Sequence, residues 1–257
     1  KILVWSQMHG NESTTTKGLI DYLNYLNLDK NEFKNISKNY SLYILPILNP
    51  DGAILYTREN ANKVDLNRDA LDCSQPESNV LRNVLEEFNP DYCFNLHDQR
   101  TIFGLLESKM PATMSFLTAS YNNEREFNVV RSKAAKIIVG IDNELQKFIP
   151  NQVGRFDDSF NINCTGDFFT NKGYPTILFE AGHYHNDYQR DVVRKYVFIS
   201  IKSAISSIVE NVIVEPDFNK YLHIYQNNKC FYDFIFKNVK IIDNNVEKII
   251  KFAVQYK

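Results

Sequence analysis

Short apolar runs alternate along the chain with longer amphipathic stretches. The runs at residues 2–5, 43–48, 92–96 and 176–179 have the length and the apolar, aromatic or β-branched content of buried strands. Apolar residues recur at helical spacing after residue 12, around residues 81–88, and over 123–148 and 189–210. Strands that alternate with helices in this way predict an α/β fold with an open mixed, mostly parallel sheet flanked by helices.

The pattern changes near residue 217. From there the chain is rich in aromatic residues, has short alternating runs, and carries Asn-Asn pairs at 227–228 and 244–245 that are typical of turns. We therefore predict two units, a catalytic domain over residues 1–216 and a small β-rich C-terminal extension over residues 217–257.

Polar residues follow each of the four predicted strands. His9 comes after the first strand, Asn49 after the second and His97 after the third, and Glu180 closes the fourth. Open α/β sheets place their sites at the carboxyl ends of strands, so we expect these side chains to converge on one cleft.

Composition narrows the range of partners. Lys and Arg total 29 against 31 Asp and Glu, which gives a formal net charge of -2 over 257 residues. No basic excess points to nucleic acid, and no apolar run approaches the roughly 20 residues that span a bilayer, so neither partner is expected. The first residues do not have the pattern of a signal peptide, and we expect a cytoplasmic protein.

The four cysteines, Cys73, Cys93, Cys164 and Cys230, lie far apart without a CxxC pair. In a chain of this length they are expected to be reduced, mostly buried thiols rather than disulfides or thiolate zinc ligands.

The segment 9–12 places a histidine and a carboxylate three residues apart. His9 and Glu12 stand between a strand and a helix, and His97 at the end of another strand would complete a set of two histidines and one glutamate. Catalytic zinc sites have three protein ligands and one open position, where a water molecule becomes acidic. The spacing alone also fits a core histidine followed by a helix-capping glutamate.

Two further segments carry candidate chemistry. Residues 58–69 are rich in Arg, Asn and Asp, which suits an anion clamp as well as a solvated loop. Glu180 ends an apolar strand, where a buried carboxylate is costly without a partner. That partner is either a metal-bound water or a core arginine.

Together these segments resemble the zinc carboxypeptidases, the M14 metallopeptidases. The shared strings are HGNE, NPDG, TREN followed by VDLNRD, NLHD and ILFEAG, in the family's order between His9 and His183. The resemblance implies one Zn²⁺ ion per chain, held by three ligands that are His9, Glu12 and His97. It implies that Glu180 is the general base, that Arg58 stabilises the oxyanion, and that Asn67 and Arg68 hold the substrate carboxylate. Asp65 would orient a ligand histidine from outside the metal shell.

The function that this resemblance implies is a zinc metallocarboxypeptidase, a hydrolase that cuts the last peptide bond of a substrate with a free carboxylate. An N-acyl amino acid deacylase related to aspartoacylase and succinylglutamate desuccinylase would use the same zinc site, although NPDG and FEAG favour the carboxypeptidase branch. A binding module without turnover is the alternative from another class, and the presence of every catalytic position argues against it.

The sequence departs from the family in three places, and the second and third departures leave specificity open. Only eight residues precede His9, where family members have further strands and a helix, so the sequence is either a piece of a longer chain or has a different sheet edge. The family's mobile tyrosine has no clear match, with Tyr174 the nearest candidate. Asp98-Gln99-Arg100 follows His97 in place of small and aromatic residues. Polar residues near the predicted cleft are candidates for a specificity pocket or for surface loops: Arg155, Asp157, Asp158, His183 and His185.

Overall fold

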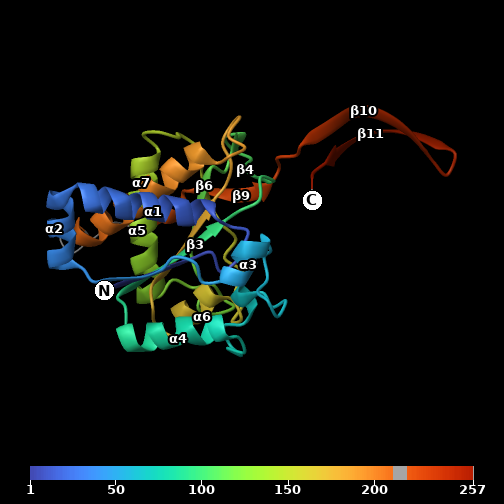
Figure 1. Cartoon of the computed structure of the whole chain (residues 1–257). Helices are drawn as coiled ribbons and strands as arrows, with labels where there is room; N and C mark the ends of the chain where they lie inside the picture. Colours follow the sequence, from blue (N-terminus) through green and yellow to red (C-terminus); the bar gives the residue numbers. More distant parts are fainter. Residues whose placement is uncertain (211–218, 257) are drawn as a thin grey trace.

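A nine-stranded mixed sheet forms the centre of the protein (Figure 1). The computed structural model describes residues 1–210 and 219–256. The strand order is β2-β1-β3-β8-β6-β7-β9-β4-β5, and five of the eight neighbouring pairs are parallel. The strands are β1 (Ile2–Ser6), β2 (Leu42–Leu45), β3 (Tyr92–Asp98), β4 (Phe103–Leu105), β5 (Met110–Pro111), β6 (Met114–Thr118), β7 (Val153–Arg155), β8 (Thr176–Ala181) and β9 (Tyr225–Lys229).

Helices cover both faces of this sheet (Figure 1). One face packs against α1 (Thr14–Leu28), α2 (Lys30–Asn39), α5 (Val129–Leu145), α7 (Asp191–Glu210) and the short α8 (Asn219–Leu222). The other face packs against α4 (Pro76–Phe88) and α6 (Thr165–Asn171). The short helix α3 (Pro50–Leu55) and the 3₁₀ turn η1 (Leu66–Arg68) lie in the connection between β2 and α4. The predicted fold class, a mostly parallel sheet flanked by helices, is therefore confirmed.

The alternation of side chains along each strand decides which core a residue joins. In β1, Ile2 and Val4 point into the core beneath α1, α5 and α7, whereas Leu3 and Trp5 join the core beneath α4 and α6. All four side chains are buried. A strand that is covered on both faces needs an apolar side chain at nearly every position, which is why the first residues have no polar alternation.

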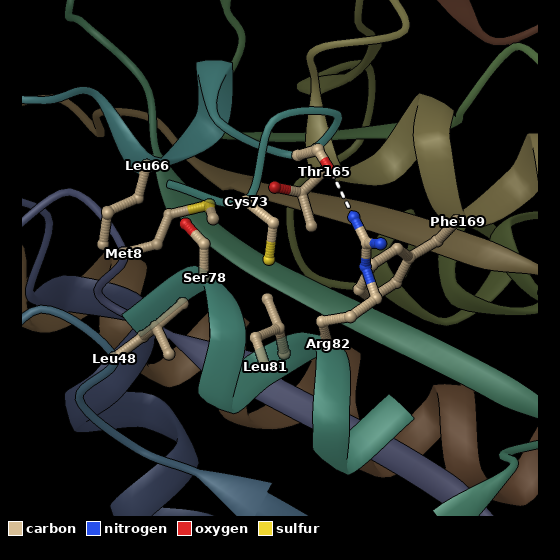
Figure 2. Close-up of a pocket in the computed structure, with 10 residues that line it drawn as sticks. Met8, Leu48, Leu66, Cys73, Ser78, Leu81, Arg82, Thr165 and Phe169 are labelled. Atoms are coloured by element: carbon tan, nitrogen blue, oxygen red, sulfur yellow. Dashed lines mark hydrogen bonds between the residues drawn. The ribbon is translucent and has the colours of Figure 1, made fainter. Parts of the chain in front are cut away.

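The core beneath α4 also supports the backbone of the polar segments. A small cavity of about 10 Å³ lies within this core. Figure 2 shows Met8, Leu48, Leu66 and Leu81 among the side chains that line it. A volume of this size holds about one water molecule, so these side chains are closely packed. Met8 directly precedes His9, and Leu66 directly precedes Asn67. The packing of Met8 and Leu66 around this cavity therefore fixes the backbone from which His9 and Asn67 extend.

The end of the chain divides into two parts. β9 joins the main sheet between β7 and β4, while β10 (Phe234–Asp243) and β11 (Val246–Val254) form a two-stranded antiparallel hairpin that projects away from the body (Figure 1). This hairpin is the small β-rich C-terminal element that was expected. The predicted boundary between residues 216 and 217 lies outside the described residues, and the division into two domains stays a prediction.

Capping side chains decide where two helices begin. The Asn49 side chain accepts a hydrogen bond from the Gly52 amide and caps α3, which Pro50 begins. The helix expected from residue 123 begins at Val129, because the Asn128 side chain caps it by accepting from the Arg131 amide. In the part of the chain that the structure describes, we find no helix with the length and apolarity needed to cross a bilayer.

Candidate active site

Three predicted metal ligands meet at the carboxyl ends of β1 and β3. The Nδ1 atom of His9 lies 2.8 Å from Oε1 of Glu12, and the Nδ1 atom of His97 lies 2.8 Å from Oε2 of the same carboxylate. The two Nδ1 atoms are 3.1 Å apart. Both imidazoles are about 2% exposed, so the three donors face one another in a nearly closed space. These three residues form a possible His-Glu-His metal site.

This donor set fits zinc. Zinc–nitrogen and zinc–oxygen bonds of about 2.0–2.2 Å place the ligand atoms of a tetrahedral site roughly 3.3 Å apart, close to the separations found here. Two imidazoles and one carboxylate are also the donors of a catalytic zinc site with one open position. The zinc that the resemblance implies would therefore be held by His9, Glu12 and His97.

Asp65 contacts the ring of His9 on the side away from the other candidate ligands. Its Oδ1 atom lies 3.0 Å from Nε2 of His9, so if Nδ1 binds a metal ion, Asp65 would accept the proton that Nε2 then carries. The second carboxylate oxygen of Asp65 accepts from Nε of Arg58 at 2.9 Å. Burial opposes ionisation of Asp65, but His9 and Arg58 outweigh it and hold the pKa of Asp65 well below its usual range.

The ligand carboxylate is held in its ionised form. Burial alone would raise the pKa of Glu12, but the imidazoles of His97 and His9 outweigh that effect and lower it well below the usual value. The backbone amide of Asp98 also donates to Oε2 of Glu12 at 3.1 Å. A carboxylate that stays ionised and hydrogen-bonded is ready to bind a cation.

Asp98 joins strand β3 to the start of helix α1. Its two carboxylate oxygens accept from the backbone amides of Thr14 and Thr15 at 2.8 and 3.0 Å. Ser13, the residue directly before α1, makes no side-chain cap, so the cap comes from β3 instead. This contact fixes the helix that follows Glu12 relative to the strand that carries His97.

Glu180 lies beside the ligands on the neighbouring strand. In the parallel pair of β3 and β8, His97 is directly opposite Glu180, so both side chains extend from the same face of the sheet. Glu180 is 8% exposed, and its Oε2 atom has no hydrogen-bond partner in the described part of the chain. Burial, together with the nearby carboxylates of Glu12 and Asp98, holds the pKa of Glu180 well above its usual value. No core arginine pairs with it among the described residues.

The predicted carboxylate clamp lies across the cleft, on η1. Oδ1 of Asn67 accepts from the Thr165 amide at 3.0 Å, which ties η1 to the start of α6. Arg68 is exposed and donates to the carbonyl of Asn67, and it has no ion pair among the described residues. A guanidinium that is free of a carboxylate partner can bind one from a ligand.

Glycines and Asn49 bring the polar segments together. A Cβ atom on Gly10 would lie 1.9 Å from the carbonyl carbon of Gly52, so only glycine allows the HGNE and NPDG segments to approach this closely. Asn49 was expected at the cleft, but it is fully buried and donates to the carbonyls of Met8 and Arg58. Asn49 therefore links the backbone just before His9 to the backbone of Arg58.

One cleft of about 590 Å³ contains the predicted residues. His9, Glu12, Arg58, Asn67, Arg68, His97 and Glu180 all line it, whereas Asp65 contacts His9 and Arg58 as described. Its walls also contain residues that sequence reasoning missed: Asn95, Phe103, Leu117, Phe156, Phe160, Cys164, Asp167 and Leu178. Asn95 and Leu178 occupy every second position before His97 and Glu180, a period that could have identified them. Tyr174, the candidate for the mobile tyrosine, packs instead against the core beneath α4.

Comparison with known proteins gives two kinds of match. The zinc carboxypeptidase family (Peptidase_M14) matches residues 1–83. "Carboxypeptidase 2" of Trichophyton rubrum is 26% identical over 100 residues, which are 38% of this chain and 19% of that protein. The chain therefore matches about a fifth of the length of this curated relative.

Solved structures extend the likeness to the rest of the fold. A putative carboxypeptidase A from Shewanella denitrificans is 17% identical with a TM-score of 0.63, covering 82% of this chain and 57% of that one. A metallo-carboxypeptidase from Pseudomonas aeruginosa, in complex with (2-guanidinoethylmercapto)succinic acid, is 19% identical with a TM-score of 0.61. The match covers 82% of this chain and 56% of that one. The resemblance to the zinc carboxypeptidase family is thus confirmed, by sequence over residues 1–83 and by fold over most of the chain.

Proposed function

We propose that this protein is a zinc-dependent metallocarboxypeptidase that hydrolyses the C-terminal peptide bond of a peptide substrate. The observation that carries the proposal is the convergence of His9, Glu12 and His97 beside the buried Glu180. Asn67 and Arg68 face the same cleft, as a carboxylate-binding pair would. One zinc ion per chain is expected.

Bound zinc supplies a Lewis acid that makes a water molecule more acidic and polarises a carbonyl group. Glu180 is proposed as the base that takes the proton from the attacking water and then passes it to the leaving amine. Its raised pKa makes the ionised carboxylate a stronger base. The positive charge of a bound metal would favour that ionised form.

Arg58 is proposed to stabilise the charge that develops on the carbonyl oxygen. Its Nη1 atom lies 3.2 Å from Nδ1 of His9, so the guanidinium is at the edge of the metal site. Its Nε atom is held by Asp65, which fixes the orientation of the group. A preorganised donor of this kind is often worth about 10²–10³ in rate.

Arg68 and Asn67 are proposed to bind the free carboxylate of the substrate. The succinic acid derivative named with the Pseudomonas aeruginosa structure carries carboxylates, which is in keeping with a site of this kind. Arg68 is exposed, so removing the substrate carboxylate leaves no buried charge without a partner, and the loss should be that of a charged hydrogen bond, about 1.5–3 kcal/mol.

The test is kcat/KM for a matched pair of peptides, one with a free C-terminal carboxylate and one amidated. The acid should be preferred by roughly 10–100-fold, and Arg68→Ala should remove most of that preference. Arg125→Ala, which removes an exposed arginine on another loop, is the matched control. Equal rates for acid and amide would contradict terminal-residue cleavage. Cleavage of N-acyl amino acids with peptides inert would indicate a deacylase instead.

A further inference from the structure

The candidate active-site cleft continues beyond the metal ligands. Glu12, Arg58, Asp98, Gln99 and Arg100 line both the cleft and a second hollow of about 520 Å³. The second hollow in turn shares Tyr188 and Arg190 with a third, of about 550 Å³. The three hollows are therefore adjacent, and the row that they form, called the groove below, leads from the metal ligands past residues 188–190 to the base of the β10–β11 hairpin.

The far end of this groove is lined by aromatic side chains. Phe231, Tyr232, Phe234 and Tyr256 come from the hairpin base, and Tyr188 comes from the loop after β8. Tyr188 is 95% exposed, Tyr256 73%, Phe234 48% and Tyr232 41%. Contiguous aromatic surface of this kind gains free energy when a ligand covers it, and such patches mark binding sites.

The hairpin base is tied to the rim of the cleft. Arg100, which lines the cleft, donates from Nη2 to Oε1 of Gln255 at 3.1 Å. The amides of Cys230 and Phe231 both donate to the carbonyl of Ile102 at 3.0 Å. The amide of Tyr256 donates to Asp233 at 2.7 Å, which closes the two strands at their base. These contacts fix the position of the aromatic end of the groove relative to the candidate active site.

We propose that this groove binds the part of a peptide substrate that precedes the scissile bond, and that its aromatic end receives a large apolar side chain upstream of the cleaved residue. The inference rests on the proposed function. The occupant follows from continuity: a chain whose C-terminus lies at Asn67 and Arg68 has the second hollow as its open path onward. His183 also lies at the aromatic end, where its ring packs on Phe231 at 5.4 Å and its buried Nδ1 has no partner among the described residues.

The test compares longer peptides with a short one. A single Trp is moved through the upstream positions of an otherwise Gly- and Ala-containing hexapeptide, and kcat/KM is measured for each peptide and for an N-acylated dipeptide with the same last residue. At the matching position, Trp should raise kcat/KM roughly ten-fold over Gly. Tyr188→Ala and Tyr256→Ala should each reduce that Trp-to-Gly ratio at least three-fold. Phe33→Ala, which removes an aromatic that is 51% exposed on α2, should leave the ratio unchanged.

The outcomes separate this inference from the proposed function. Cleavage of the dipeptide with no Trp preference at any position would overturn the groove and leave the proposed activity standing. If no peptide is cleaved, the proposed activity fails, and binding of the fluorescein-labelled Trp hexapeptide, measured by anisotropy, still tests the groove. Weaker binding by Tyr188→Ala and Tyr256→Ala than by Phe33→Ala would support it, and equal binding by all three would overturn it.

Discussion

The two halves of the central sheet contribute differently to the candidate site. The strands β2, β1, β3 and β8 are parallel throughout, and the segments that follow or end them carry His9, Glu12, His97 and Glu180. The other half, from β6 to β5, contains antiparallel pairs and provides only wall residues such as Leu117. The reacting groups thus come from one half of the sheet and the shape of the cleft comes partly from the other.

The direction of the strands explains this division. Parallel strands bring their carboxyl ends to one edge, where loop residues can converge. At the seam, β6 runs antiparallel to β8, with Ser115 opposite Glu180 and Leu117 opposite Leu178. β6 therefore presents the middle of a strand to the cleft rather than a loop. Substitutions in the parallel half should abolish chemistry, whereas those on the far side should change stability or selectivity.

The largest effect is expected from His97→Ala. Removing one of three ligands should abolish stoichiometric zinc binding, because the remaining imidazole and carboxylate no longer complete the site. Zinc content per chain, measured by elemental analysis after dialysis, is the readout, with His223→Ala as the control because that histidine is exposed. Retention of about one zinc per chain by His97→Ala would show that the metal is held elsewhere.

Glu180→Gln tests the proposed base, which lies on β8 at the boundary between the two halves of the sheet. The amide keeps the size of the side chain but cannot accept a proton, so turnover should fall roughly 10²–10⁴-fold while zinc content is unchanged. Glu144→Gln, on the surface of α5, should keep full turnover. Full activity of Glu180→Gln would move the base to another group. Asp98 is the next candidate, although both of its oxygens already cap α1.

The smallest effect is expected at Asp167, on α6 at the cleft wall, and it concerns the pH dependence of folding stability. Burial raises its pKa to about 6, although the amides of Asn161 and Ser120 donate to it. The native state therefore binds this proton more readily than the unfolded chain. The resulting stability is fully present below about pH 4 and is lost as the pH rises to about 6.

Asp167→Asn removes this dependence, since the amide does not titrate. The stability of the unmodified protein relative to the variant should fall by about 2–3 kcal/mol between pH 4 and pH 7. Urea unfolding at both pH values measures it, and Asp72→Asn, at an exposed position, is the control. A stability difference that stays constant across this range would mean that Asp167 keeps its ordinary pKa when folded.

Local sequence alone determined the parallel half of the molecule and the residues that meet there. An apolar run that is covered on both faces, such as residues 2–5, can be predicted as a strand from its own residues, without knowledge of the strands that pair with it. The order of the five motifs named the candidate ligands and the base, and the structure brings them into one cleft.

Only the tertiary structure decided the remainder, because it depends on contacts between residues far apart in the chain. The strand β7 has three residues and β9 is the polar run YQNNK, so neither has a period that predicts a strand, and each is fixed by its neighbours in the sheet. The cap of α1 comes from Asp98, 84 residues beyond Thr14, where no local signal points to it. The groove toward the hairpin likewise depends on contacts between distant residues, such as the one between Arg100 and Gln255, which hydrophobic periodicity does not predict.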